Sequence, residues 1–200
     1  MPEETNSAPF AGYKCSVFGP AAKAKLLAAE AKGCVKTEGG ARKKLTESDI
    51  IFFGGHHYAR YDLPLLFDSI DLNEFKLNSP KVKLLLISSC AGLRKNARDG
   101  FRRKFPNAYI FGWMFGSPLN QKGLMQKFIG SIDTRIDITR TEDMAKLIQR
   151  WRNFIESQVH DKSSVQPYGL GYATPQGEVS YYVRGKGMSW KWVTIGTNTK

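Results

Sequence analysis

The segment VKLLLISSCAG, residues 82–92, places an unbroken apolar run directly before two serines, a cysteine and a glycine. A second segment, IIFFGGHH at residues 50–57, has the same order and ends in two glycines followed by His56 and His57. Strands that are apolar at every position are typical of parallel sheets covered on both faces, because a half-exposed strand alternates apolar and polar residues. Both segments are therefore predicted to be central strands of an α/β sheet.

The flanking segments alternate between strand and helix patterns. Residues 13–18 read as a strand and residues 21–32 as a helix, while residues 63–70 and 92–104 read as helices on either side of the second central strand. Residues 108–111 form a third short apolar run. Strands that alternate with helices in this way predict a mainly parallel sheet with helices packed against it.

The last third of the chain has a different pattern. Apolar residues recur at three- and four-residue spacing over 144–155, which predicts an amphipathic helix with Thr141 as its N-cap. Residues 178–184 and 188–195 are predicted to be paired strands on either side of a glycine-containing turn. We therefore expect a helix and a β-hairpin appended to the sheet.

The domain organisation predicted from these patterns is simple. Residues 1–11 are polar and aperiodic, and we expect a flexible leader there. Residues 12–200 are expected to form a single domain, in which residues 131–200 are the helix and hairpin appendage.

Composition and charge limit the function classes. The 200 residues are 42% hydrophobic and carry a formal net charge of +12, which attracts polyanions without selecting one. No apolar stretch approaches the roughly 20 residues of a membrane-spanning helix, and no secretory signal begins the chain. We expect a cytoplasmic protein, or one exported by a specialised secretion system.

Three irregularly spaced cysteines, Cys15, Cys34 and Cys90, indicate neither a disulfide framework nor a zinc site.

The candidate chemistry follows the two central strands. Ligands of parallel α/β sheets bind at the carboxyl ends of the strands, where His56 and Cys90 stand. If the two strands are neighbours, the imidazole and the thiol share one edge, as nucleophilic catalysis by cysteine requires. Cys15 and Cys34 are expected to be small apolar residues in strands.

These two blocks resemble the caspase-like cysteine peptidases, a superfamily that includes caspases, metacaspases and bacterial CHAT-domain proteins. In that family one apolar strand ends in a His-Gly pair and a second ends in a small residue and the nucleophilic cysteine; Gly55-His56 and the segment SSCAG at 88–92 look like these blocks. The order of elements over residues 12–130 also suits the family. The resemblance implies a three-layer caspase-like sandwich with a mainly parallel sheet.

The resemblance also implies a cysteine endopeptidase that cleaves protein or peptide substrates through an acyl-enzyme, without metal or cofactor. Cys90 would be the nucleophile and His56 the acid and base, while the backbone N–H groups of His57 and Cys90 would form the oxyanion hole. His57 stands where the family usually has glycine. Since two adjacent histidines follow the strand, His57 is the alternative catalytic base.

A helix that begins near Gly92, together with Arg94 and Lys95, is expected to favour the Cys90 thiolate. A short, basic chain of this kind fits a bacterial peptidase used in defence or an effector toxin.

Two other functions are compatible with the sequence. The histidine pair, with His160 and the positive charge, fits a metal-dependent nuclease toxin, and a non-catalytic basic binding module would keep the fold alone. Nucleic acid is a less favoured partner. The cationic residues of the helix after Cys90 are expected to face solvent; they are Arg94, Lys95, Arg98, Arg102, Arg103 and Lys104. The aromatic residues of the last two strands are expected to pack on the domain; they are Tyr181, Tyr182, Trp190 and Trp192.

Overall fold

The structure is a computed structural model. For five short outer strands, at residues 5–6, 16–19, 34–35, 65–66 and 70–71, it describes the backbone. It also describes residues 45–46, 48–54, 76–116, 124, 127–128, 136–159, 167–187 and 189–196. The strands are β1 (Thr5–Asn6), β2 (Ser16–Gly19), β3 (Cys34–Val35), β4 (Ile50–Gly54), β5 (Leu65–Leu66), β6 (Ile70–Asp71), β7 (Leu84–Ser88), β8 (Tyr109–Trp113), β9 (Leu170–Ala173), β10 (Val179–Arg184) and β11 (Trp190–Ile195). The helices are α3 (Lys95–Lys104) and α5 (Thr141–Gln158).

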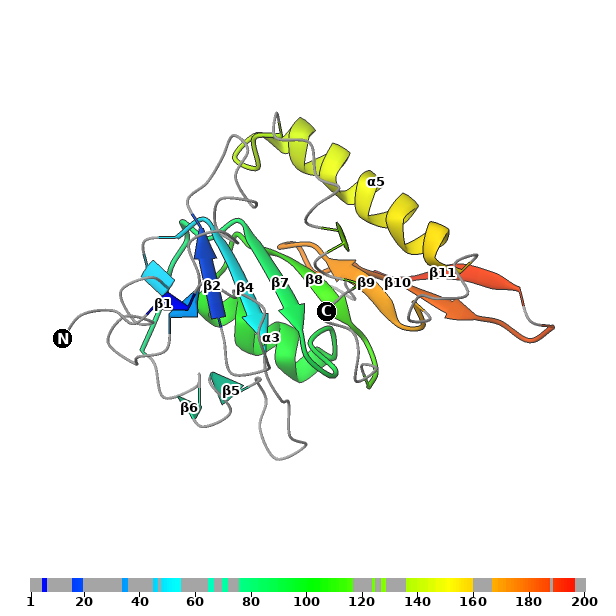
Figure 1. Ribbon diagram of the computed structural model, residues 1–200, viewed down its shortest axis with the longest axis horizontal. Coiled ribbons are helices and arrows are strands. Elements are labelled where there is room, and N and C mark those ends of the chain that lie inside the picture. Colours follow the sequence, from blue (N-terminus) through cyan, green and yellow to red (C-terminus); the bar gives the residue numbers. More distant parts are fainter. Residues whose placement is uncertain are drawn as a thin grey trace.

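The protein has an α/β architecture built on one mixed sheet. Its nine described strands lie in the order β1-β3-β2-β4-β7-β8-β9-β10-β11 (Figure 1). Among these strands, β4, β7 and β8 run parallel to one another, and the pairs outside them are antiparallel. The central apolar strands are therefore confirmed in place and in direction.

The prediction of a mainly parallel sheet is wrong, because parallel pairing is confined to this centre. β4 and β7 are apolar up to their last residues, Gly54 and Ser88, and lie between two covered faces, as parallel strands do. The outer strands differ, since β11 has only half-buried and exposed positions, as an antiparallel strand with a solvated face does. The pattern of the centre does not extend to the edges.

The last third of the chain continues the same sheet. β9 pairs with β8 through Ile110 and Ala173, and β10 lies antiparallel to both β9 and β11. At the other end, β1 lies within the segment predicted as a leader and pairs with β3. Residues 170–195 therefore extend the sheet of the central strands.

A helix predicted over 63–70 is wrong, because β5 and β6 lie there and pair antiparallel through Leu66 and Ile70. The segment is short and apolar, and periodicity alone does not separate a short apolar helix from a strand.

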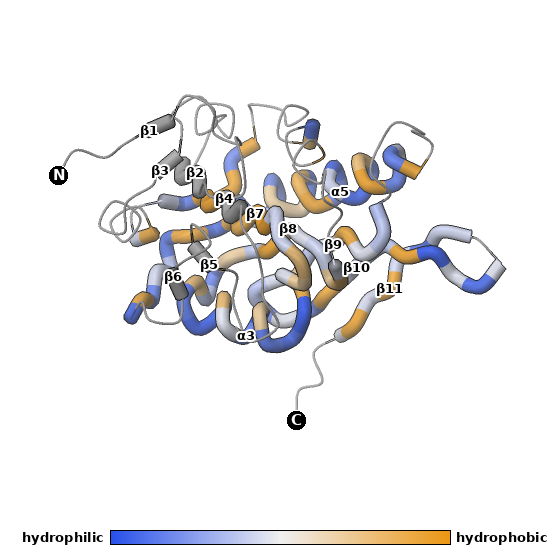
Figure 2. The backbone as a smooth tube through the Cα atoms, turned by 60° about the horizontal axis from the view of Figure 1, so that its bottom comes forward, coloured by the Kyte–Doolittle hydropathy of each residue, from blue (hydrophilic) through white to orange (hydrophobic). Residues whose placement is uncertain are grey.

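Two apolar cores lie on opposite faces of the sheet. Leu84 and Leu86 of β7 belong to the core on the α5 side, while Leu85 and Ile87 belong to the core on the α3 side. This alternation is the two-residue period of a strand. Figure 1 shows α3 and α5 on either side of the sheet, and Figure 2 shows hydrophobic residues concentrated at β4 and β7. The sheet is thus covered by helices on both faces.

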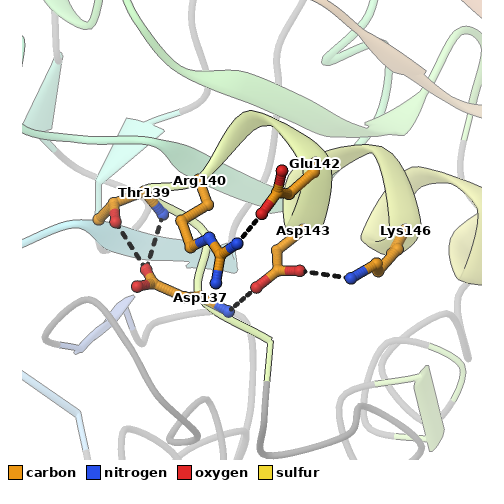
Figure 3. A network of polar contacts seen from close by, with 6 residues as sticks. All are labelled: Asp137, Thr139, Arg140, Glu142, Asp143 and Lys146. Atoms are coloured by element: carbon orange, nitrogen blue, oxygen red, sulfur yellow. Dashed lines mark hydrogen bonds and ion pairs between the residues drawn. The ribbon is translucent and has the colours of Figure 1, made fainter.

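α5 is the predicted amphipathic helix with a different start. Arg140, in extended conformation, is the N-cap and makes no side-chain cap bond, so the prediction that Thr141 is the cap is wrong. Arg140 pairs instead with Glu142, while the Asp143 carboxylate accepts from the backbone N–H of Asp137 at 3.1 Å (Figure 3). The Asp143 carboxylate therefore ties the loop before α5 to the first turn of the helix.

Candidate active site

The carboxyl ends of β4 and β7 meet at one edge of the sheet. The two strands are parallel neighbours, and Gly54 at the end of β4 is the Cα partner of Ser88 at the end of β7. The sequence-based condition that these strands be adjacent is therefore met. Any side chain that follows either strand closely leaves the sheet at the same edge.

Cys90 lies two residues beyond β7 at this edge, in a turn that leads to α3. It is half-buried and carries a thiol rather than a disulfide. Ala91 has φ +57°, a left-handed conformation that is uncommon for residues other than glycine, asparagine and aspartate. Its backbone N–H donates to the carbonyl oxygen of Phe115 at 2.8 Å, and the N–H of Leu93 donates to that of Trp113 at 2.9 Å. The turn that carries Cys90 is thus tied to the end of β8.

Gly92 is required by a close approach to the sheet. A Cβ atom at this position would lie 2.7 Å from Cγ2 of Ile87, which is closer than real contacts allow. Because Ile87 belongs to the core on the α3 side, the turn is seated on that core. Glycine therefore allows the chain to pass this close to Ile87 directly after Cys90.

Buried polar atoms accompany this edge. Ser88 is 3% exposed and Ser89 is fully buried. The Oγ atom of Ser89 and the indole Nε1 of Trp113 have no hydrogen-bond partner among the described residues. A buried donor without a partner costs about 1–3 kcal/mol. Ser89 follows β7 and Trp113 ends β8, so these unpaired groups distinguish the carboxyl edge from the apolar centre of the sheet.

α3 begins later than predicted, and this changes the surroundings expected for the thiol. Its first residue is Lys95, with Arg94 as the N-cap, so Cys90 lies five residues before the helix. The ammonium of Lys95 contacts Oδ2 of Asp99 at 2.8 Å. The chain follows the end of β8 before it turns into the helix. The predicted helix start at Gly92 is therefore wrong by three residues, and Lys95 is paired with Asp99.

Several predicted site residues lie outside the described residues. These are the catalytic base His56, the alternative base and oxyanion donor His57, and His160 and Cys15. Their roles, and that of the Cys90 backbone N–H, stay predictions. Cys34 lies in β3, in agreement with its predicted place in a strand.

The described residues contain no group of three or more His, Cys, Asp and Glu side chains placed to hold a metal ion. In the same part of the chain, no helix combines the length and apolar character that a membrane span needs.

Part of the predicted solvated cationic face is structural. Arg98 donates to the carbonyl oxygen of Gly177 at 3.3 Å, and Arg102 donates to that of Thr174 at 3.3 Å. Burial, and then repulsion by Arg102, lower the pKa of Arg98. The two guanidinium groups thus hold the turn between β9 and β10 against α3. Their four-residue spacing on one side of the helix is the signal that could have indicated this role.

The aromatic residues of the last two strands pack on the domain, as predicted. Trp190 stacks on Tyr182 with ring centroids 5.3 Å apart, and both contribute to the core on the α5 side. The indole N–H of Trp192 donates to Glu156 at 2.6 Å, and the guanidinium of Arg152 lies 4.6 Å from the ring centroid of Trp192. These contacts join β11 to α5.

Comparison of the chain with protein-family models, with curated proteins and with solved structures finds no match.

Proposed function

We propose that the protein is a cysteine endopeptidase of caspase-like architecture in which Cys90 is the nucleophile and His56 the catalytic base. The mixed sheet with α3 on one face and α5 on the other supports a three-layer sandwich of this kind. The proposed substrate is a protein or peptide, and the proposed setting is bacterial defence or an effector toxin.

The register of β4 and β7 carries the proposal. Cys90 follows Ser88 by two residues, His56 follows Gly54 by two residues, and Gly54 and Ser88 are partners in the parallel pair. Neighbouring strands are about 4.8 Å apart, and two residues span at most about 7 Å. The equal offsets support a thiol and an imidazole within reach of each other.

The chemistry has two steps. The Cys90 sulfur attacks the scissile carbonyl carbon while its proton passes to His56; the tetrahedral intermediate then collapses, the C–N bond breaks, and His56 gives the proton to the leaving amine. A water molecule, deprotonated by His56, next attacks the thioester and releases the acid and the thiol. Backbone N–H groups at the strand ends stabilise the oxyanion in both steps.

The test compares wild type with Cys90→Ala and His56→Ala on a mixed peptide library, with product masses measured and EDTA added in parallel. Cys34→Ala and His160→Ala are matched controls, because they remove the same groups elsewhere. We expect both site variants to lose about 10³-fold or more in kcat/KM, both controls to retain activity, and EDTA to have no effect.

Other outcomes would overturn the proposal. Activity lost to His57→Ala and retained in His56→Ala would move the catalytic base by one residue. Full activity of folded Cys90→Ala, or loss of activity with EDTA, would exclude a thiol mechanism. An unreactive Cys90 and no cleavage by folded wild type would favour a binding module.

A further inference from the structure

A cavity of about 310 Å³ lies at the edge of the sheet opposite Cys90. Lys83 precedes β7, Tyr109 begins β8, and Thr141 begins α5, so the amino ends of two central strands and one helix meet there. Small-molecule sites in proteins have volumes of roughly 300–1,000 Å³. The cavity is therefore large enough for a small organic molecule.

The polar lining of the cavity consists of a cation and neutral groups. Lys83 and Asn107 both donate to the carbonyl oxygen of Pro80, at 3.1 and 2.9 Å. An ammonium has three N–H donors and an amide has two, so each group keeps donors after this bond. The shared carbonyl holds the two side chains together. The other polar side chains that line the cavity are Tyr109, Thr139, Thr141 and Gln176.

No carboxylate belongs to the described lining, although three lie nearby at the start of α5. Figure 3 shows the partner of each: Glu142 pairs with Arg140, Asp143 contacts Lys146 at 2.8 Å, and Asp137 accepts from Thr139, a residue of the lining. Arg140 and Lys146 balance two of the three charges. Lys83 is the one charged side chain of the described lining.

The remaining lining is apolar and consists of Ile138, Met144 and Pro175. We propose that this cavity binds a small organic anion, whose charged group contacts Lys83 and Asn107 and whose apolar body lies against Ile138, Met144 and Pro175. A cationic group joined to an apolar wall selects such a ligand over inorganic phosphate, which lacks an apolar body, and over a neutral ring, which lacks the charge.

The proposal does not depend on peptidase activity. The cavity lies at the amino end of β7, whereas Cys90 follows its carboxyl end. Cys90→Ala is therefore expected to bind the small anion as wild type does. Loss of peptidase activity and loss of anion binding can thus be measured independently of each other.

The test titrates ¹⁵N-labelled full-length protein with phenyl phosphate, inorganic phosphate and phenol, and follows the amide resonances. We expect phenyl phosphate to shift amides of residues 83, 107, 109, 139 and 141 and to bind at least about tenfold more tightly than either fragment, a difference of about 1.4 kcal/mol. Lys83→Met should weaken its binding about tenfold. Lys186→Met removes the same charge from an exposed turn and should change the affinity less than about twofold.

Three results would overturn the proposal: shifts scattered over the surface, equal affinity for phenyl phosphate and inorganic phosphate, or equal weakening in Lys83→Met and Lys186→Met. If Lys83→Met does not fold, Thr141→Val is the variant that tests the anion site. It should weaken binding about threefold, and an unchanged affinity would contradict the site.

Discussion

The two faces of the sheet are filled in different ways. On the α5 side, large rings meet: Trp151 stacks on Phe111 at 5.2 Å and meets Phe128 edge-on at 4.4 Å. On the α3 side, the packing depends on close approach, as at Gly92, and on guanidinium groups bound to carbonyl oxygens. The turn that carries Cys90 belongs to this second face. Both faces hold large buried side chains, among them Phe101 and Phe105 on the α3 side. The comparison predicts that removing a ring from the α5 face mainly lowers stability, whereas changing the α3 face near Gly92 also moves the thiol.

The largest expected effect on stability is at Trp151. Trp151→Ala removes a fully buried ring and its hydrogen bond to the carbonyl oxygen of Gly171, and should lower the free energy of unfolding by about 3–5 kcal/mol. Urea denaturation measures this loss. Below the unfolding transition, the rate at which iodoacetamide labels Cys90 should equal that of wild type. A changed labelling rate of Cys90 in the folded variant would contradict the proposal that packing on the α5 face does not position the thiol.

Gly92→Ala tests the other face. The added methyl group collides with Ile87, and overpacking of this kind costs about 1–3 kcal/mol. We expect a smaller loss of stability than in Trp151→Ala but a larger change in the labelling rate of Cys90. Gly116→Ala is the control, because a Cβ there meets no atom of the described residues, its chain neighbours aside, within 4 Å. Identical labelling of Gly92→Ala and wild type would contradict a positioning role of the turn.

A third, smaller effect is expected at Arg102. Arg102→Met keeps most of the side-chain length but loses the hydrogen bond to Thr174, which should cost about 1 kcal/mol. Hydrogen exchange of the Gly177 amide, which donates to Thr174 within the turn, should become faster. Arg103→Met changes an exposed residue of the same helix and should leave this exchange unchanged. Equal exchange in both variants would show that the turn does not need the guanidinium group.

The smallest effect concerns pH and the start of α5. Hydrogen bonds from Lys146 and from the Asp137 backbone lower the pKa of Asp143, and bonds from Thr139 lower that of Asp137. Since the folded pKa values lie below the ordinary value of 3.8, this stabilisation is complete above that value and is lost as the pH falls through the folded pKa values. Unfolding measured between pH 5 and pH 2 should depend less on pH in Asp143→Asn than in wild type. An unchanged dependence would contradict the assignment.

The sequence predicts the parts of this fold that rest on local periodicity. The apolar runs of β4 and β7 and the spacing of Met144, Leu147 and Trp151 each report on one segment and its burial. Strand direction at the edges depends on partners far along the chain, so the antiparallel pairing of β8 with β9 was not predictable from either strand. The helix predicted over residues 63–70 was wrong because the apolar residues there fit both the helix period and the strand period.

The candidate site divides in the same way. Placing Cys90 after a central strand required only the apolar run before it. Before α3 starts at Lys95, Ala91 and Leu93 donate to Phe115 and Trp113, partners that no pattern around Cys90 contains. The carbonyl partners of Arg98 and Arg102 are likewise more than seventy residues away.

The position of β9 has a consequence for synthesis on the ribosome. Ile110 of β8 pairs with Ala173 of β9, so one edge of β8 lacks this partner until about sixty more residues have been added. At about 5–20 residues per second, that interval lasts roughly 3 to 12 seconds. Phe111 also lacks Trp151 for about the first forty of these residues and Tyr172 for nearly all of them. An open apolar strand edge is a template for aggregation. Faster translation of the intervening segment is expected to raise the soluble yield, and chaperones that hold nascent chains should have the same effect.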